Sequence, residues 1–246
     1  MTDTIASWIN IRDKIESWSE LAGLVEKYRA NRWIFRGVRD ASYALVPGIG
    51  RPGTRKDMDT GQELPFDEKE ELAMLARFQR EVHPYARSAK RVDLGHDWEL
   101  RALAQHHGLK TRLLDWSESP LIAAFFAVES AGIVNGRRAD AALYGISCPL
   151  VIDSDTLKWP EGHDVVAFYP PHVTSRITVQ RALFTIHSEP DRPWDPPDLK
   201  KWLIPSGTCL AIKLALSRAG INRASLFPDA DGIAAHINWL HKWGLQ

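Results

Sequence analysis

The feature that most constrains the fold is an apolar stretch near the middle of the chain, Leu-Ile-Ala-Ala-Phe-Phe-Ala-Val-Glu-Ser-Ala-Gly, over residues 121–132. Ser119 and Pro120 stand directly before it, and a Ser at the N-cap with a Pro in the first turn signals the start of a helix. Because this stretch is apolar around nearly its whole circumference, we expect the helix to lie in the interior. Other elements must cover it, and 246 residues with 44% hydrophobic content are enough for such a core.

Three further helices are expected in the first half of the chain. They cover residues 3–30 with a cap at Ser19, about 67–89, and about 97–107, where Gly108 supplies the stop. The apolar face of the second of these helices should consist of Leu72, Leu75, Phe78 and Val82.

Strands dominate the second half, and residues 50–66 form the most loop-like stretch. Helices and strands mix without regular β-α alternation, which predicts an α+β fold with a central mixed or antiparallel sheet flanked by helices. We interpret residues 1–246 as a single domain, with a helical lead-in over 1–30 and a core over 31–246. Strand or extended structure is expected at 33–37, 111–116, 141–147, 165–169, 177–179, 183–187 and 208–214.

Composition and missing motifs exclude several classes of protein. Lys plus Arg and Asp plus Glu are both 31, so the chain lacks the positive surplus that drives non-specific nucleic-acid binding. No apolar run reaches 18 residues and the N-terminus lacks the pattern of a secretion signal, which predicts a cytoplasmic protein that spans no membrane. The histidines and the two cysteines show neither HExxH nor Cys-x-x-Cys spacing, so no metal site is expected. GxGxxG, GxxxxGK[ST] and GxSxG are absent as well.

Residues 101–119 carry the densest set of polar groups. Gln105, His106 and His107 stand at a helix end, and Arg112, Asp115 and Ser117 follow on a strand that leads into the buried helix. Polar groups beside an apolar helix are costly to bury unless they are paired or functional. The alternative is purely structural: Arg112 pairs with Asp115, Gln105 binds backbone, and one His lies satisfied in the core.

Three other places could carry chemistry. Arg36 ends an apolar strand with a guanidinium fork suited to phosphate or carboxylate, and Gly37 allows close approach of a ligand or of backbone. These residues alone favour an interior ion pair. Gln180 lies between two apolar stretches and could satisfy backbone or bind a ligand. Asp229 and Asp231 precede a helix, where we favour an N-cap over a metal or acid/base role.

These segments together resemble the FRG domain, a bacterial and phage family named for its Phe-Arg-Gly motif. The resemblance covers roughly residues 30–240 and implies a role as a toxin or phage-defence effector. It rests on Trp33-Ile-Phe-Arg-Gly37, Leu103-Ala-Gln-His-His-Gly108, Thr111-Arg-Leu-Leu-Asp-Trp116, Ser119-Pro120, Ala124, Phe126-Ala127, Arg176-Ile177, Gln180, Phe184, Leu226-Phe-Pro-Asp229 and Asp231-Gly232.

The chain is also similar, more weakly, to ADP-ribosyltransferases, which place an Arg on an early strand to hold the NAD phosphates. This resemblance implies that NAD is the substrate and that nucleic acid or protein is the acceptor. It assigns Arg36 and Gly37 to the pyrophosphate, Gln105 and Arg112 to the phosphate and ribose pocket, His106 or His107 to a hydrogen bond, Asp115 and Ser117 to the nicotinamide side, and Gln180 to the reacting ribose.

ADP-ribosyltransferases carry a catalytic Glu on a later strand, and this chain departs from the pattern there. Gln180, Arg181 and Ala182 offer no carboxylate at that place. If the chain catalyses the reaction, the acid must come from Glu118, Asp115, Glu189 or Asp229.

Two other functions stay open at this point. One is a metal-dependent nuclease-type toxin that uses His106, His107 and Asp115. The other is a non-catalytic ligand-binding or interaction module, in which the polar cluster is a buried network. A neutralising partner protein would accompany a toxin.

Overall fold

The computed structural model describes residues 13–29, 32–86, 97–130, 133–134, 137–153, 159–170 and 179–245. Contacts between Cα atoms divide the chain into two compact units, each assembled from separated segments. The first unit comprises Met1–Tyr43, Ser119–Ser147 and Pro197–Gln246, and the second comprises Ala44–Glu118 and Cys148–Pro196. The prediction of a single domain is not tested by this division and stays a prediction.

The first unit is built on three antiparallel strands. β5 (Ala141–Ser147) lies between β1 (Trp33–Val38) and β9 (Lys200–Ile204). A small hairpin, β3 (Ile133–Val134) with β4 (Arg137–Arg138), follows the central helix. The helices of this unit are α1 (Trp18–Lys27), α4 (Pro120–Glu129), α6 (Cys209–Arg218), α7 (Arg223–Leu226) and α8 (Ala230–Lys242).

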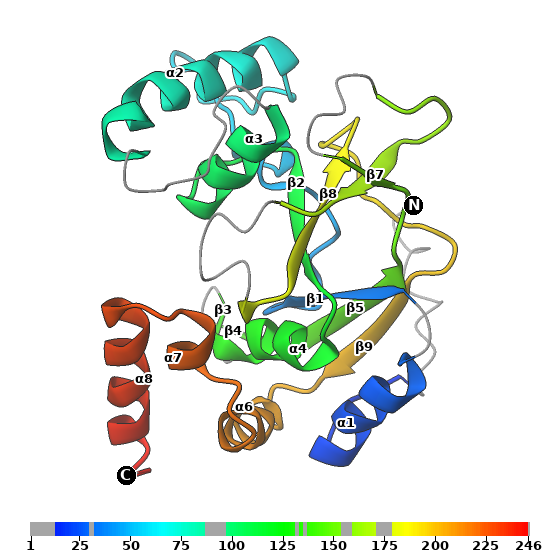
Figure 1. Ribbon diagram of the computed structural model, residues 1–246, viewed down its shortest axis with the longest axis vertical. Coiled ribbons are helices and arrows are strands. Elements are labelled where there is room, and N and C mark those ends of the chain that lie inside the picture. Colours follow the sequence, from blue (N-terminus) through cyan, green and yellow to red (C-terminus); the bar gives the residue numbers. More distant parts are fainter. Residues whose placement is uncertain are drawn as a thin grey trace. The chain divides into compact units, whose positions relative to one another are not determined.

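Helix α4 is the centre of the first unit and confirms the expectation from its apolar sequence. It packs on β1 and β5 and also contacts α1 and α6 (Figure 1). Ser119 is its N-cap, accepting the N–H of Ile122, and Pro120 is the first helical residue. A Cβ placed on Gly37 of β1 would lie 1.9 Å from the carbonyl oxygen of Ala123. The glycine therefore lets strand and helix backbones meet more closely than any other residue would.

The second unit contains a four-stranded mixed sheet and two helices. Its strands lie in the order β6 (Val151–Ile152), β7 (Val165–Phe168), β8 (Ala182–His187) and β2 (Leu113–Ser117). β6 and β7 are parallel, and the other two pairs are antiparallel. The short η1 (Gly48–Gly50) and the helices α2 (Glu68–Ala86) and α3 (Asp97–His106) complete this unit. The α+β class and the mixed sheet are confirmed.

The structure corrects several details. Helix α1 is capped by Ser17 and not by Ser19, because Ser17 and Glu20 form a reciprocal capping box. On α2, Leu72 is exposed, and Glu71 is buried in its place on the face that holds the buried Leu75 and the half-buried Phe78. The prediction of a strand at residues 208–214 is wrong, because these residues are helical apart from Thr208, the N-cap.

They belong to helix α6, whose buried residues Cys209, Ile212 and Leu216 recur at intervals of three and four. Strand β9 over 200–204 was not expected, since its two leading lysines mask the pattern. The strand expected at 177–179 falls mainly outside the described residues, and Val179 is helical. Among the described residues, no helix combines the length and the apolar character needed to cross a membrane.

Candidate functional site

The end of helix α3 shapes the candidate site in the second unit. Gly108 has φ +91°, and the Leu109 N–H donates to the Ala104 carbonyl oxygen at 2.9 Å while the Gly108 N–H donates to that of Gln105 at 2.9 Å. These two bonds are the Schellman pattern, which requires a left-handed residue and so favours glycine. Leu109 packs back on the cluster that contains Ala104. The chain thus reverses within a few residues and enters β2 beside Gln105.

A line of hydrogen bonds runs from β2 through Gln105 to Asp115. The Leu113 N–H donates to Thr111 Oγ1 at 3.2 Å, and the Thr111 hydroxyl donates to Gln105 Oε1. Because Oε1 is the acceptor, the Gln105 Nε2 group is the donor that reaches Asp115 Oδ1 at 2.9 Å. Four of the five β2 residues are buried and Asp115 is exposed. The local fold therefore holds an exposed carboxylate in a set orientation.

Arg112 is held by carboxylates from α2. Its Nε donates to Glu71 Oε2 at 2.7 Å, and its NH2 group lies 2.6 Å from the same oxygen. Glu68 contacts the same NH2 group at 3.0 Å, and Arg101 reaches Glu71 at 3.6 Å. Arg112, Arg101 and Glu71 are all buried. Arg112 therefore pairs with Glu71 and not with Asp115, and its role on NAD phosphates stays a prediction.

Ser117 contacts the backbone of Gln180, and the predicted roles of both residues on NAD stay predictions. The buried Ser117 hydroxyl donates to the Gln180 carbonyl oxygen at 2.8 Å, and the Glu118 N–H donates to that of Arg181 at 3.3 Å. Arg181 has φ +46°, an uncommon conformation for a residue other than glycine. Such strain tends to occur at functional sites. Ser117 thereby fixes the turn that leads into β8.

A second polar chain in this unit was not expected from the sequence. The Trp116 indole N–H donates to Thr185 Oγ1 at 2.9 Å, and the Thr185 hydroxyl lies 2.9 Å from His187 Nε2. Which of these two groups donates depends on the tautomer of His187, because the Thr185 hydroxyl has two lone pairs and one proton. All three side chains are buried, and the Trp194 ring stands nearly perpendicular to both Trp116 and His187. Nothing in the spacing of these residues signals this contact, because it joins neighbouring strands.

The other candidate residues are placed as follows. His106 is half-buried, His107 is exposed, and their ring centroids lie 5.2 Å apart. Arg36 is half-buried on β1 of the first unit. Asp229 caps α8 by accepting the Gly232 N–H at 2.8 Å, which confirms the N-cap interpretation.

A cavity of about 330 Å³ adjoins the turn that follows α3. Arg55 on its wall is paired with Glu70 and Asp67, and Lys110 donates to Thr54 Oγ1 at 3.4 Å. The volume is at the lower end of the range for small-molecule pockets, which is about 300–1,000 Å³. The residues lining it are Ile49, Thr54, Arg55, Phe66, Asp67, Glu70, Glu71, Met74, Gly108, Leu109 and Lys110.

Comparison with known proteins gives one match, to a family model that covers part of the chain. No curated protein and no solved structure matches the chain significantly. The family model of the FRG domain matches residues 31–134. This segment includes the Phe35-Arg36-Gly37 strand, the Gln105–Asp115 network and helix α4, whereas the later motifs, from Arg176 onward, lie outside the matched segment. Residues 31–134, which are less than half of the chain, are thus similar to the FRG domain.

Proposed function

We propose that the chain is a cytoplasmic, NAD-consuming enzyme of the ADP-ribosyltransferase type, in which Asp115 supplies the carboxylate that stabilises the reacting ribose. The acceptor is nucleic acid or protein. A role as a toxin or phage-defence effector, with a neutralising partner, belongs to the same proposal.

The observation that carries this proposal is the anchored, exposed carboxylate of Asp115. When the bond between nicotinamide and ribose breaks, nicotinamide leaves with the bonding electrons and positive charge develops on the ribose. The acceptor then bonds to the ribose C1′ and loses a proton. A carboxylate fixed before the reaction stabilises that charge without reorganising. The Thr111–Gln105–Asp115 hydrogen bonds provide such fixation.

The other three candidate acids are less suited to this role. The carboxylate of Asp229 is used as an N-cap. Glu189 is exposed and pairs with Arg192 at 2.6 Å within one loop. Glu118 is exposed and accepts the Tyr169 hydroxyl at 2.8 Å, which makes it the second choice after Asp115.

The cavity beside the same turn gives additional support. It combines apolar walls from Phe66, Met74 and Leu109 with the charged groups of Arg55 and Lys110. Its apolar walls suit a ring such as those of NAD, whereas the carboxylates of Asp67, Glu70 and Glu71 outnumber the two cations, so its charge does not favour an anionic group. The predicted role of Arg36 on the pyrophosphate is kept as part of the proposal.

The test is nicotinamide release from NAD by the purified protein, measured with water and with added nucleic acid or protein as acceptors. Asp115→Asn keeps the shape of the side chain and removes its charge, and we expect it to lower release by roughly 100- to 1,000-fold, the usual cost of removing one electrostatic stabiliser. Thr111→Val, which removes the hydroxyl that orients Gln105, should lower release less. Asp191→Asn, at an exposed loop position, is the matched control.

Two outcomes would contradict the proposal. One is full nicotinamide release by Asp115→Asn; if Glu118→Gln then abolishes release, the carboxylate is Glu118. The other is the absence of release by the unmodified protein with every acceptor, which would reject NAD chemistry altogether.

A further inference from the structure

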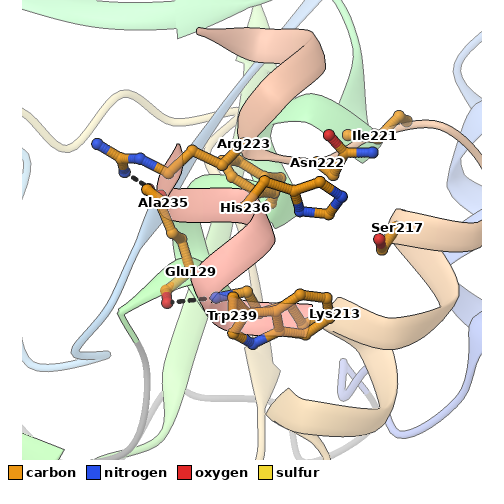
Figure 2. Close-up of a pocket in the computed structure, with 10 residues that line it drawn as sticks. Glu129, Lys213, Ser217, Ile221, Asn222, Arg223, Ala235, His236 and Trp239 are labelled. Carbon is orange, nitrogen blue, oxygen red and sulfur yellow. Dashed lines mark hydrogen bonds and ion pairs between the residues drawn. The ribbon is translucent and has the colours of Figure 1, made fainter. Parts of the chain in front are cut away.

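The first unit contains a small pocket of its own, which the proposed NAD chemistry does not use. It lies between the end of α4, helix α6, the start of α7 and helix α8 (Figure 2). Lys213 and Ser217 stand four positions apart on α6, so they share one helix face. His236 and Trp239 stand three positions apart on α8 and likewise share a face. The polar groups that line the pocket are Glu129, Lys213, Ser217, Asn222, Arg223 and His236.

Positive charge exceeds negative charge in this pocket. Among the described lining residues Glu129 is the sole carboxylate, and its Oε1 is ion-paired with Arg223. Lys213 instead donates to the backbone oxygen of Glu129 at 2.9 Å, and its Nζ lies 4.9 Å from the centre of the Trp239 ring. The Lys213 ammonium thus faces a carbonyl oxygen and an aromatic ring, and neither carries the full negative charge that would neutralise it.

The pKa values of two groups reflect burial first and the neighbouring positive charges second. Burial lowers the pKa of Lys213, and the nearby charges of Arg223 and Lys242 lower it further, while Glu129 opposes the shift. Burial also lowers the pKa of His236, with a further contribution from Lys213. Both shifts are those of cationic groups in a desolvated, positive environment, which an anion would relieve.

Hydrogen-bond donors also outnumber acceptors around the pocket. Asn222 uses Oδ1 to accept the Ser225 N–H at 3.1 Å, which leaves its amide nitrogen as the donor side. The Nε–H of Arg223 is buried and meets no acceptor among the described residues. Figure 2 shows the His236 ring directed toward Ser217, with Asn222 on one side and Trp239 on the other.

The size of the cavity limits the ligand. Its volume is about 40 Å³. One buried water needs roughly 10–15 Å³ on this measure, so the space holds about three waters or one group of similar size. A nucleoside or a peptide side chain of ordinary size does not fit.

We propose that this pocket binds a small oxyanion with the chemistry of inorganic phosphate, held by the Lys213 ammonium, the His236 imidazole and the Asn222 amide. The negative charge of the anion offsets the positive charge of Lys213, which Glu129 does not neutralise because it is paired with Arg223. The binding site is independent of the Asp115 carboxylate, so either proposal can fail without the other.

The test is a titration of the full chain with inorganic phosphate at constant ionic strength, followed by the proton NMR signal of the His236 ring. We expect a saturable shift and a higher pKa of His236 in phosphate than in chloride. Lys213→Met should weaken phosphate binding by at least about tenfold, because it removes a charge-assisted hydrogen bond. Lys213→Arg keeps the charge and should retain binding, and Lys69→Met, at an exposed position on α2, is the control.

The proposal is overturned if phosphate shifts His236 no more than chloride does, or if Lys213→Met binds phosphate as the unmodified protein does. Thermal unfolding without phosphate establishes that each variant is folded. If Lys213→Met fails to fold, the comparison of Asn222→Gln with the unmodified protein decides the matter: unchanged phosphate affinity rejects the site.

Discussion

Replacing Glu71 with glutamine tests whether the polar residues at the start of β2 stabilise the fold. Glu71 is 1% exposed, and its carboxylate meets Arg112 at 2.6 and 2.7 Å and Arg101 at 3.6 Å. Glutamine keeps the shape and removes the charge. Both buried guanidinium groups then lose their shared carboxylate, and breaking a buried pair in this way costs about 3–5 kcal/mol.

The magnitude follows from what remains around Arg112. Glu68 stays 3.0 Å away, but its side chain is 66% exposed, and exposed pairs contribute about 0–1 kcal/mol. We therefore expect Glu71→Gln to lower the free energy of unfolding by about 3–4 kcal/mol. At about 2–4 °C per kcal/mol for a chain of this size, Tm should fall by roughly 6–16 °C.

The assay is urea and thermal unfolding followed by circular dichroism, with Glu68→Gln as the matched control on the same helix and the same arginine. Glu68→Gln should cost less than about 1 kcal/mol. The reasoning is refuted if Glu71→Gln unfolds within about 1 kcal/mol of the unmodified protein, or if the two variants lose equal stability.

Three further predictions concern backbone and thiol chemistry. Gly37→Ala should destabilise the protein by about 1–3 kcal/mol or more in urea unfolding, because the added Cβ would lie 1.9 Å from the Ala123 carbonyl oxygen. Gly108→Ala meets no atom within 4 Å, but its φ is +91°, so we expect a smaller loss of about 1–2 kcal/mol from backbone strain alone; an equal loss for the two variants would contradict this distinction. Burial raises the pKa of the Cys209 thiol, so less of the reactive thiolate is present at pH 8, and a thiol reagent should modify the half-buried Cys148 first and Cys209 only as urea unfolds the chain.

Local signals were sufficient to predict most of the elements from sequence. Ser119 and Pro120 mark the start of α4, and Gly108 marks the end of α3, because caps and left-handed turns depend on a few adjacent residues. The apolar runs of β1 and β8 likewise predict strands without reference to any distant residue. Cys209 to Leu214 was wrongly expected to be a strand, since a short apolar run does not distinguish the two periods without its packing partners.

The candidate site could be predicted in part. The sequence predicts a dense polar cluster in the segment that holds Gln105, Thr111 and Asp115. In the structure, Gln105 and Asp115 of this segment are hydrogen-bonded to each other. The partner of Arg112 could not be found, because Glu71 lies 41 residues away and reads as an ordinary helix-surface residue. Long-range pairs of this kind depend on which helix face turns inward. The apolar pattern of α2 assigns Glu71 to the exposed face, but the structure buries it.

The chain passes from one unit to the other more than once, and this limits whether residues 31–134, the segment that matches the FRG domain, can fold alone. Residues 31–134 contain β1 and β2, but β1 pairs with β5 (Ala141–Ser147) and β2 pairs with β8 (Ala182–His187), both outside that segment. A fragment ending at residue 134 would therefore carry two strands whose antiparallel partners are missing, and unpaired strand edges promote association with other chains. We therefore expect residues 31–134 not to fold as an independent module, and truncations of this protein to need both β5 and β8.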